Sequence, residues 1–315
     1  MLKDTIRADA ADTMFVEREL LQKKAQAYEK KYPQLKGRLF VPLGTNYDPA
    51  VEIIVYEMYD QVGMAKVITN YANDFPRAEV SGIEYPAKVK SLGDSFGYSV
   101  MDVRRARMAG RPLESRKSNA ARRAMLEKEE VITALGDADH KLVGLLNNEN
   151  VPTITAVDID VTGAVVTEWA HKTAAQILVD LNLFESTIQT NTKGTESPDT
   201  LLLPPGELTR IRQMRLDDSD MTVLEWFLSK SQSIRNVDSW HFLDTAGLKA
   251  DEVTACQRAM AYRRDIDYVE HPLPQDFEYP VPLALKGMEY EQICHERTGG
   301  VIMRYPLGSL YMDGI

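Results

Sequence analysis

Residues 51–101 carry a pattern of alternating side chains that is typical of a long β ribbon. Residues 51–59 are rich in β-branched and aromatic types, and residues 73–82 carry turn-forming types at both ends. The return strand over 83–101 has a period of two, in which Ile83, Tyr85, Ala87 and Val89 alternate with Glu84, Pro86, Lys88 and Lys90. A ribbon of two strands cannot bury its own faces and is only marginally stable in water. We therefore expect it to lie either on its own chain's body or on a neighbouring subunit.

The stretch that follows, residues 112–136, is predicted to form one long helix. Its apolar residues recur every three to four positions, at Leu113, Ala120, Ala121, Ala124, Met125, Val131, Ile132 and Leu135. Gly136 stands where a helix often ends in a left-handed residue. The basic residues come first and the acidic ones last, against the preference of the helix dipole. These charges either serve a neighbouring molecule or form a solvated face.

The densest basic stretch of the chain covers residues 104–123 and contains a single acid, Glu114. Two partners fit such a surface: an acidic patch on another subunit, or the phosphates of DNA. A solvated helix start is the alternative. The candidate inter-subunit or DNA-facing residues are Arg104, Arg105, Arg107, Arg111, Arg116, Lys117, Arg122 and Arg123.

Composition limits the classes of protein that remain. The 315 residues suggest about two domains. A net charge of -10 argues against a dedicated nucleic-acid binder, although it leaves room for a local basic patch. Two cysteines form no disulfide framework and fit a reducing cytosol. The N-terminus lacks the apolar core of a signal peptide, and no apolar run approaches the length of a membrane span, so we expect neither.

The rest of the chain predicts a mixture of helices and strands, an α+β protein. Helices are expected over 14–32, 164–184, 222–231 and 250–263. Thr222 and Glu225 form a capping box at the start of the third of these. A buried strand is expected over 201–203 and another near the C-terminus.

Two short motifs suggest chemistry, but their context is incomplete. Gly93–Gly97 fits G-x-S-x-G, in which Ser95 would be a hydrolase nucleophile, yet this motif needs a strand, a sharp turn and a helix. The alternating residues around Ser95 favour a strand instead. Glu291, Cys294, His295 and Glu296 lack the second Cys/His pair that zinc sites usually have. We predict no catalytic residue, no metal and no cofactor.

Several segments, taken in order, resemble one known family. They are the long hairpin, the helix ending EKEEVITALGDADHKLVGLLNNENV, the segment SPDTLLLPPGELTRI and the closing GGVIMRYP. Together they resemble the major capsid proteins of tailed bacteriophages with the Hong-Kong-97-like fold, which encapsulin shells share. The resemblance spans about residues 14–310.

The resemblance implies an organisation for the whole chain. It implies an N-terminal arm (1–35), the start of a peripheral domain (36–50), an extended β-hairpin loop lying on a neighbour (51–103), the peripheral domain with its spine helix at 112–136 (104–195), an axial domain (196–285) and a return to the peripheral domain (286–315). It also implies a shell of hexamers and pentamers in the virion, assembled in the host bacterial cytoplasm, non-specific contact with packaged double-stranded DNA, and no membrane. Because only a short segment precedes the first helix, a scaffold, if any, is expected to be a separate protein. Portal and decoration proteins are further expected partners.

Overall fold

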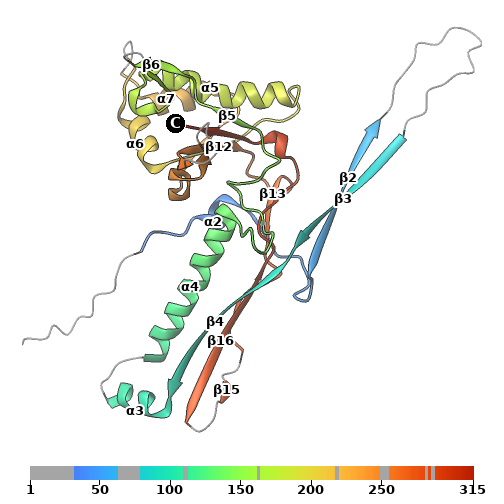
Figure 1. The fold of residues 1–315 in the computed structure, drawn as a ribbon, viewed down its shortest axis with the longest axis vertical. Helices are drawn as coiled ribbons and strands as arrows, with labels where there is room; N and C mark the ends of the chain where they lie inside the picture. Colours follow the sequence, from blue (N-terminus) through green and yellow to red (C-terminus); the bar gives the residue numbers. More distant parts are fainter. Residues whose placement is uncertain are drawn as a thin grey trace, which may run out of the picture. The chain divides into compact units, whose positions relative to one another are not determined.

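The computed structural model describes residues 32–62, 79–108, 113–161, 164–216, 220–248, 255–280, 283–284 and 288–315. The chain divides into two compact units, residues 1–34 and 35–315, and the second contains nearly all of the described residues. It mixes helices and sheets, which confirms the predicted α+β class (Figure 1). The helix predicted over 14–32 and most of the predicted N-terminal arm lie outside the described residues.

A five-stranded sheet forms the centre of the fold, with the order β5–β18–β12–β8–β9. Its strands are Thr153–Thr155 (β5), Leu310–Asp313 (β18), Arg258–Tyr262 (β12), Thr200–Leu203 (β8) and Asn236–Ser239 (β9). Both of its faces are covered. Leu201 and Leu203 of β8 join one core with the helices Ala174–Asn191 (α5), Pro205–Gln213 (α6) and Val223–Lys230 (α7), whereas Leu202 joins a second core with Phe40 and Leu145. Alternate residues of one strand thus fill two cores, because side chains on a strand point to opposite faces.

The second main sheet is built on a ladder between two distant segments. β4 (Lys90–Ser99) pairs antiparallel with β16 (Glu289–Thr298) over ten residues. The short strands Gln275–Glu278 (β14) and Leu283–Ala284 (β15) pair with β16 as well. The long helix α4 (Leu113–Leu135) runs along β4 and β16, and α3 (Val100–Met108) precedes it (Figure 1).

The remaining elements connect these layers. They are α2 (Gly37–Phe40), β1 (Leu43–Gly44), β6 (Ile159–Val161), β7 (Ala164–Val166), β10 (Gly247–Leu248), β11 (Ala255–Cys256), β13 (Val269–Pro272) and β17 (Ile302–Met303), with 3₁₀ turns at Trp169–His171, His241–Asp244 and Pro306–Gly308. In the described ranges, no helix is both long and apolar enough to cross a lipid bilayer.

The structure contains the predicted ribbon, but its return strand ends at Lys88 and does not continue to residue 101. β2 (Ile53–Val62) pairs with β3 (Glu79–Lys88) as a two-stranded ribbon. The strand predicted to continue through residue 101 is split at Val89 into β3 and β4. β4 belongs to the sheet under α4. Val89 is buried with Ile54 and Ile302 at the base of the ribbon, so the chain changes sheets there without breaking its period of two. Part of the predicted β region therefore lies on the protein's own body.

The other sequence predictions had mixed outcomes. The helix over 112–136, the strand over 201–203 and the short helix capped by Thr222 are confirmed. The helix predicted over 164–184 begins later, at Ala174, after a capping box formed by Thr173 and Gln176. The helix predicted over 250–263 is wrong, because residues 255–256 and 258–262 are strands. All five residues of β12 are buried, so packing on both faces overrides the helix propensity of Ala and Met there.

Gly136 has a positive φ of 70° at the end of α4, as predicted. A Cβ at this position would lie 2.3 Å from the backbone oxygen of Leu142 and 2.7 Å from the backbone nitrogen of Gly144. Gly194 has a similar φ of 76°, but open space surrounds the place of its Cβ. The two glycines therefore differ in crowding and share their backbone conformation.

We predict that Gly136→Ala lowers the free energy of unfolding by more than about 3 kcal/mol, since backbone clashes add to the strain. Gly194→Ala should cost only about 1–2 kcal/mol, which is the strain of a left-handed L-residue. Urea unfolding of both variants and the parent measures the difference. Equal losses would show that the loop 142–144 yields to a side chain at position 136.

Candidate functional site

The predicted basic residues that the structure describes lie on two successive helices, α3 and α4. Arg104 and Arg105 are exposed on α3, and Arg116 and Arg122 are exposed on α4. Three cations are already engaged within the chain: Arg105 faces Asp102 at 3.7 Å, Arg123 bonds Glu127 at 2.7 Å, and Lys117 donates to the backbone oxygen of Gly97 at 2.6 Å. Arg122 lies 5.9 Å from the centre of the Phe277 ring. Arg111 and the side chain of Arg107 lie outside the described residues.

Ser95 stands in the middle of β4, opposite Ile293 of β16. Its hydroxyl donates to Oε1 of Glu291 at 2.8 Å. A nucleophile elbow needs a sharp turn at the serine, so a ten-residue strand at this position overturns the hydrolase interpretation of Gly93–Gly97. The neighbouring acidic and sulfur-containing residues of β16 alternate between its two faces, and the described residues hold no group of three or more His, Cys, Asp and Glu side chains placed to bind a metal ion.

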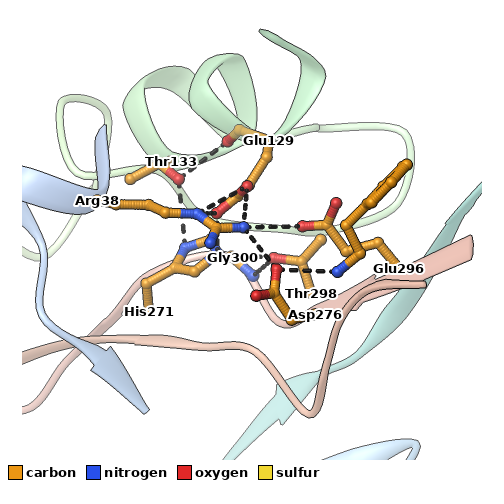
Figure 2. Close-up of polar contacts among 9 residues, drawn as sticks. Arg38, Glu129, Thr133, His271, Asp276, Glu296, Thr298 and Gly300 are labelled. Atoms are coloured by element: carbon orange, nitrogen blue, oxygen red, sulfur yellow. Dashed lines mark hydrogen bonds and ion pairs between the residues drawn. The ribbon is translucent and has the colours of Figure 1, made fainter. Parts of the chain in front are cut away.

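A partly buried polar cluster that the sequence analysis did not foresee joins α2, α4 and the second sheet (Figure 2). We define this polar cluster as Arg38, Glu129, His271, Asp276 and Glu296. Arg38 donates to both carboxylate oxygens of Glu129, with its closest bonds at 2.8 Å. The same guanidinium donates to Asp276 at 2.9 Å and lies 3.8 Å from Glu296. One cation therefore faces three carboxyl groups.

Two members of the polar cluster are kept neutral by their surroundings. Burial and the neighbouring charge of Glu129 raise the pKa of Glu296 to about 8. Neither carboxyl oxygen of Glu296 has a hydrogen-bond partner among the described residues. Burial and the charge of Arg38 lower the pKa of His271 to about 4, and its ring lies between Thr133 and Thr298 at 3.3 and 3.1 Å. At neutral pH the polar cluster therefore contains a protonated Glu296 and an uncharged His271.

The polar cluster connects the first residues of the second unit to α4. Arg38 follows the boundary between the two units by only a few residues and binds the buried end of α4. Glu130, next on the helix, accepts from the backbone of Lys36 and from the indole of Trp240. These hydrogen bonds fix the position of α2 against α4 and the second sheet. The sequence held one sign that Glu129 and Glu130 are buried: they lie within one helical turn of the apolar Ile132 and of Thr133, which are both buried. That sign was weak, because acidic residues near a helix end usually face solvent.

Comparison with known proteins decides the family. Residues 63–315 match the family described as major capsid protein. This chain belongs to the major capsid protein family. No curated protein sequence matches it.

The fold is similar to that of solved capsids over nearly the whole length of both chains. The capsid of Myoviridae phage XM1 is 15% identical, with a TM-score of 0.79 and coverage of 95% of this chain and 98% of that one. Mycobacterium phage Ogopogo gives 10% identity and a TM-score of 0.60, covering 95% and 98%. A virus-like particle from Pyrococcus furiosus gives 10% identity and a TM-score of 0.54, covering 87% and 90%. These likenesses confirm the fold that the sequence resemblance implied.

For a major capsid protein, the functional sites are the surfaces on which copies meet. Among the described residues, the ribbon β2–β3 carries several apolar side chains that the rest of the described chain leaves exposed. Ile53, Val55, Tyr59 and Ile83 are each more than half exposed. Exposed apolar residues that lie together on a strand pair favour contact with another protein surface.

The protonated state of Glu296 predicts how stability depends on pH. Its pKa in the folded protein is raised from the ordinary 4.5 to about 8, so the folded state keeps a proton that the unfolded state releases. The contribution of this group is therefore full below about pH 4.5 and is lost as pH rises towards 8. In Glu296→Gln, which cannot ionise, the free energy of unfolding should exceed that of the parent by about 3–5 kcal/mol at pH 9 and by less than about 1 kcal/mol at pH 5.

Chemical unfolding at a series of pH values measures this difference. Glu289→Gln, an exposed change on the same strand, controls for the loss of one carboxylate and should leave the pH dependence of the parent unchanged. Parallel profiles for the parent and Glu296→Gln would show that Glu296 is already ionised at neutral pH.

Proposed function

We propose that this chain is the building block of the icosahedral shell that encloses the double-stranded DNA genome of a tailed bacteriophage. The observation that carries the proposal is the family match over residues 63–315 combined with a fold similar, end to end, to the capsid of Myoviridae phage XM1. The chain assembles with itself into hexamers and pentamers of the shell. It acts in the virion, after assembly in the cytoplasm of the host bacterium.

The proposed division of labour follows the domain ranges given above. The segment 1–35 reaches a neighbour as an arm, the ribbon within 51–103 lies on an adjacent subunit, and residues 196–285 meet their symmetry mates around the capsomer axes. The exposed apolar residues of β2 and β3 support the second of these roles, because the chain's own core covers only the base of the ribbon. Head-to-tail contacts of this kind close into rings when their rotation permits.

The other partners in the proposal are held by weaker contacts. The basic residues of 104–123 meet acidic patches on adjacent subunits, and the inner surface makes non-specific contact with packaged DNA. A net charge of -10 is compatible with this role when DNA is driven into the shell rather than drawn in by a basic lining. A separate scaffold, a portal and a decoration protein complete the assembly.

A shell that holds a protein cargo, as encapsulins do, is the second candidate function. The likeness to the virus-like particle from Pyrococcus furiosus favours it, and its TM-score of 0.54 is below the 0.79 of the phage XM1 capsid. The two shells differ in what they enclose.

We expect the purified protein, expressed alone, to form closed shells or rings of five and six subunits. Negative-stain electron microscopy and sedimentation measure this, and absorbance at 260 nm separates nucleic acid from protein inside the shells. A protein that stays monomeric even when its concentration is raised far above the micromolar range would contradict self-assembly as its function.

Shortening the ribbon should abolish assembly without unfolding the subunit. We would replace residues 57–84 with Asn-Gly, which forms a tight hairpin turn, next to the stacked pair Tyr56 and Tyr85, whose ring centres lie 5.3 Å apart. The base residues Ile54, Ala87 and Val89 then keep their packing. We expect a subunit with the parent's circular dichroism and unfolding midpoint but no shells. Shells at the parent's yield would show that the ribbon does not hold subunits together.

A further inference from the structure

The two faces of the ribbon differ in their surroundings. Ile54 lies on the face that packs against Ile302 at the body of the protein. The opposite face, which we call the outer face, carries Ile53, Val55, Glu57 and Tyr59 of β2 opposite Lys88, Pro86, Glu84 and Gly82 of β3. Ile53, Val55 and Tyr59 are 52%, 51% and 65% exposed. Because side chains alternate across a strand, the body that covers Ile54 cannot also cover the outer face.

Two acids stand directly opposite each other in the middle of the outer face. Glu57 and Glu84 are cross-strand partners in the register of the ribbon, and both are exposed. Like charges at such a position destabilise a strand pair. Within the described ranges, neither carboxylate has a salt-bridge partner. The ribbon thus keeps a like-charge pair amid apolar residues, an arrangement that a cation on another surface would stabilise.

Tyr59 lies beside this pair and contacts both strands of the ribbon. Its hydroxyl donates to Glu57, and its ring lies over Gly82, where a Cβ would come within 3.0 Å of the ring. The bond to Glu57 and the charges of both acids raise the pKa of Tyr59 above its ordinary value. Glu57, Glu84 and Tyr59 therefore form one carboxylate patch, with an aromatic ring at its edge.

The cation that fits this patch is a guanidinium. Arginine binds carboxylates through two parallel hydrogen bonds and stacks on aromatic rings, which a lysine ammonium does less well. In a chain of net charge -10, residues 104–123 are the densest basic surface. Arg104 and Arg116 are exposed there, and neither has a carboxylate partner among the described residues, whereas Arg105 and Arg123 are already paired.

We infer that the carboxylate patch of one copy docks on Arg104 and Arg116 of a second copy. The contact is head-to-tail, since it joins two different surfaces of identical chains, and it can therefore repeat around a ring. This inference rests on the proposed shell function and adds to it the face of the ribbon that docks and the residues that receive it. The apolar side chains of the outer face exclude water around the ion pairs, which strengthens them.

The test is a charge swap between the two surfaces. Glu57→Lys/Glu84→Lys and Arg104→Glu/Arg116→Glu should each raise the protein concentration needed for assembly by at least about tenfold. The chain that carries all four changes should recover to within about threefold of the parent. In the parent, added salt should weaken assembly, because screening acts on these ion pairs. Sedimentation velocity measures assembly, and circular dichroism and the unfolding midpoint show whether each variant is folded.

A matched control replaces the receiving residues with two exposed basic residues elsewhere. Glu57→Lys/Glu84→Lys combined with Lys230→Glu/Arg235→Glu has the same net charge as the swap and should not recover assembly. Recovery in this control, or none in the swap, would overturn the inference. Normal shells from Glu57→Lys/Glu84→Lys alone would overturn it as well and leave the proposed function intact. A parent that never assembles would contradict both.

Discussion

The ten-residue ladder between β4 and β16 is the interaction on which the rest of the described structure depends. It joins residues 90–99 to residues 289–298, so the middle of the chain and its final part form one surface. The long helix α4 lies along that surface, and the polar cluster bridges the helix to it through Arg38. Antiparallel pairing over this length also fixes the register strongly, because a slip by one residue would turn Cys294 and Glu296 from the buried face to the other.

The polar cluster and the buried Phe40 together hold α2 against the rest of the second unit. The single positive charge of Arg38 lies close to three carboxyl groups, which would leave an excess of negative charge if all three were ionised. A proton retained on Glu296 removes one of those negative charges. A buried ion pair is costly to assemble and still more costly to break on one side only. The position of α2 against α4 is therefore specified by polar geometry as much as by the packing of Phe40.

Local sequence patterns predicted the elements whose signal is local. The helix α4 has an unbroken periodicity and a terminal glycine, and α7 has a capping box, so both could be placed from the sequence. β12 could not, because a strand buried on both faces has no alternation to recognise. The division of the ribbon at Val89 was equally hidden, since the period of two runs through the point where the chain changes sheets. The polar cluster gathers residues from positions 38, 129, 271, 276 and 296, and only the tertiary fold brings them together.

The five-stranded sheet determines how a subunit unfolds, because its strands contribute side chains to both cores. Leu201 and Leu203 of β8 belong to one core and Leu202 to the other, and β12 likewise gives Ala259 and Ala261 to the first and Met260 to the second. Neither core can lose its order while the other keeps it, because both would need the same strands in place. The two cores should therefore melt as a single cooperative unit. A shell made of such subunits contains few half-folded members, since each is either ordered through the sheet or denatured as a whole.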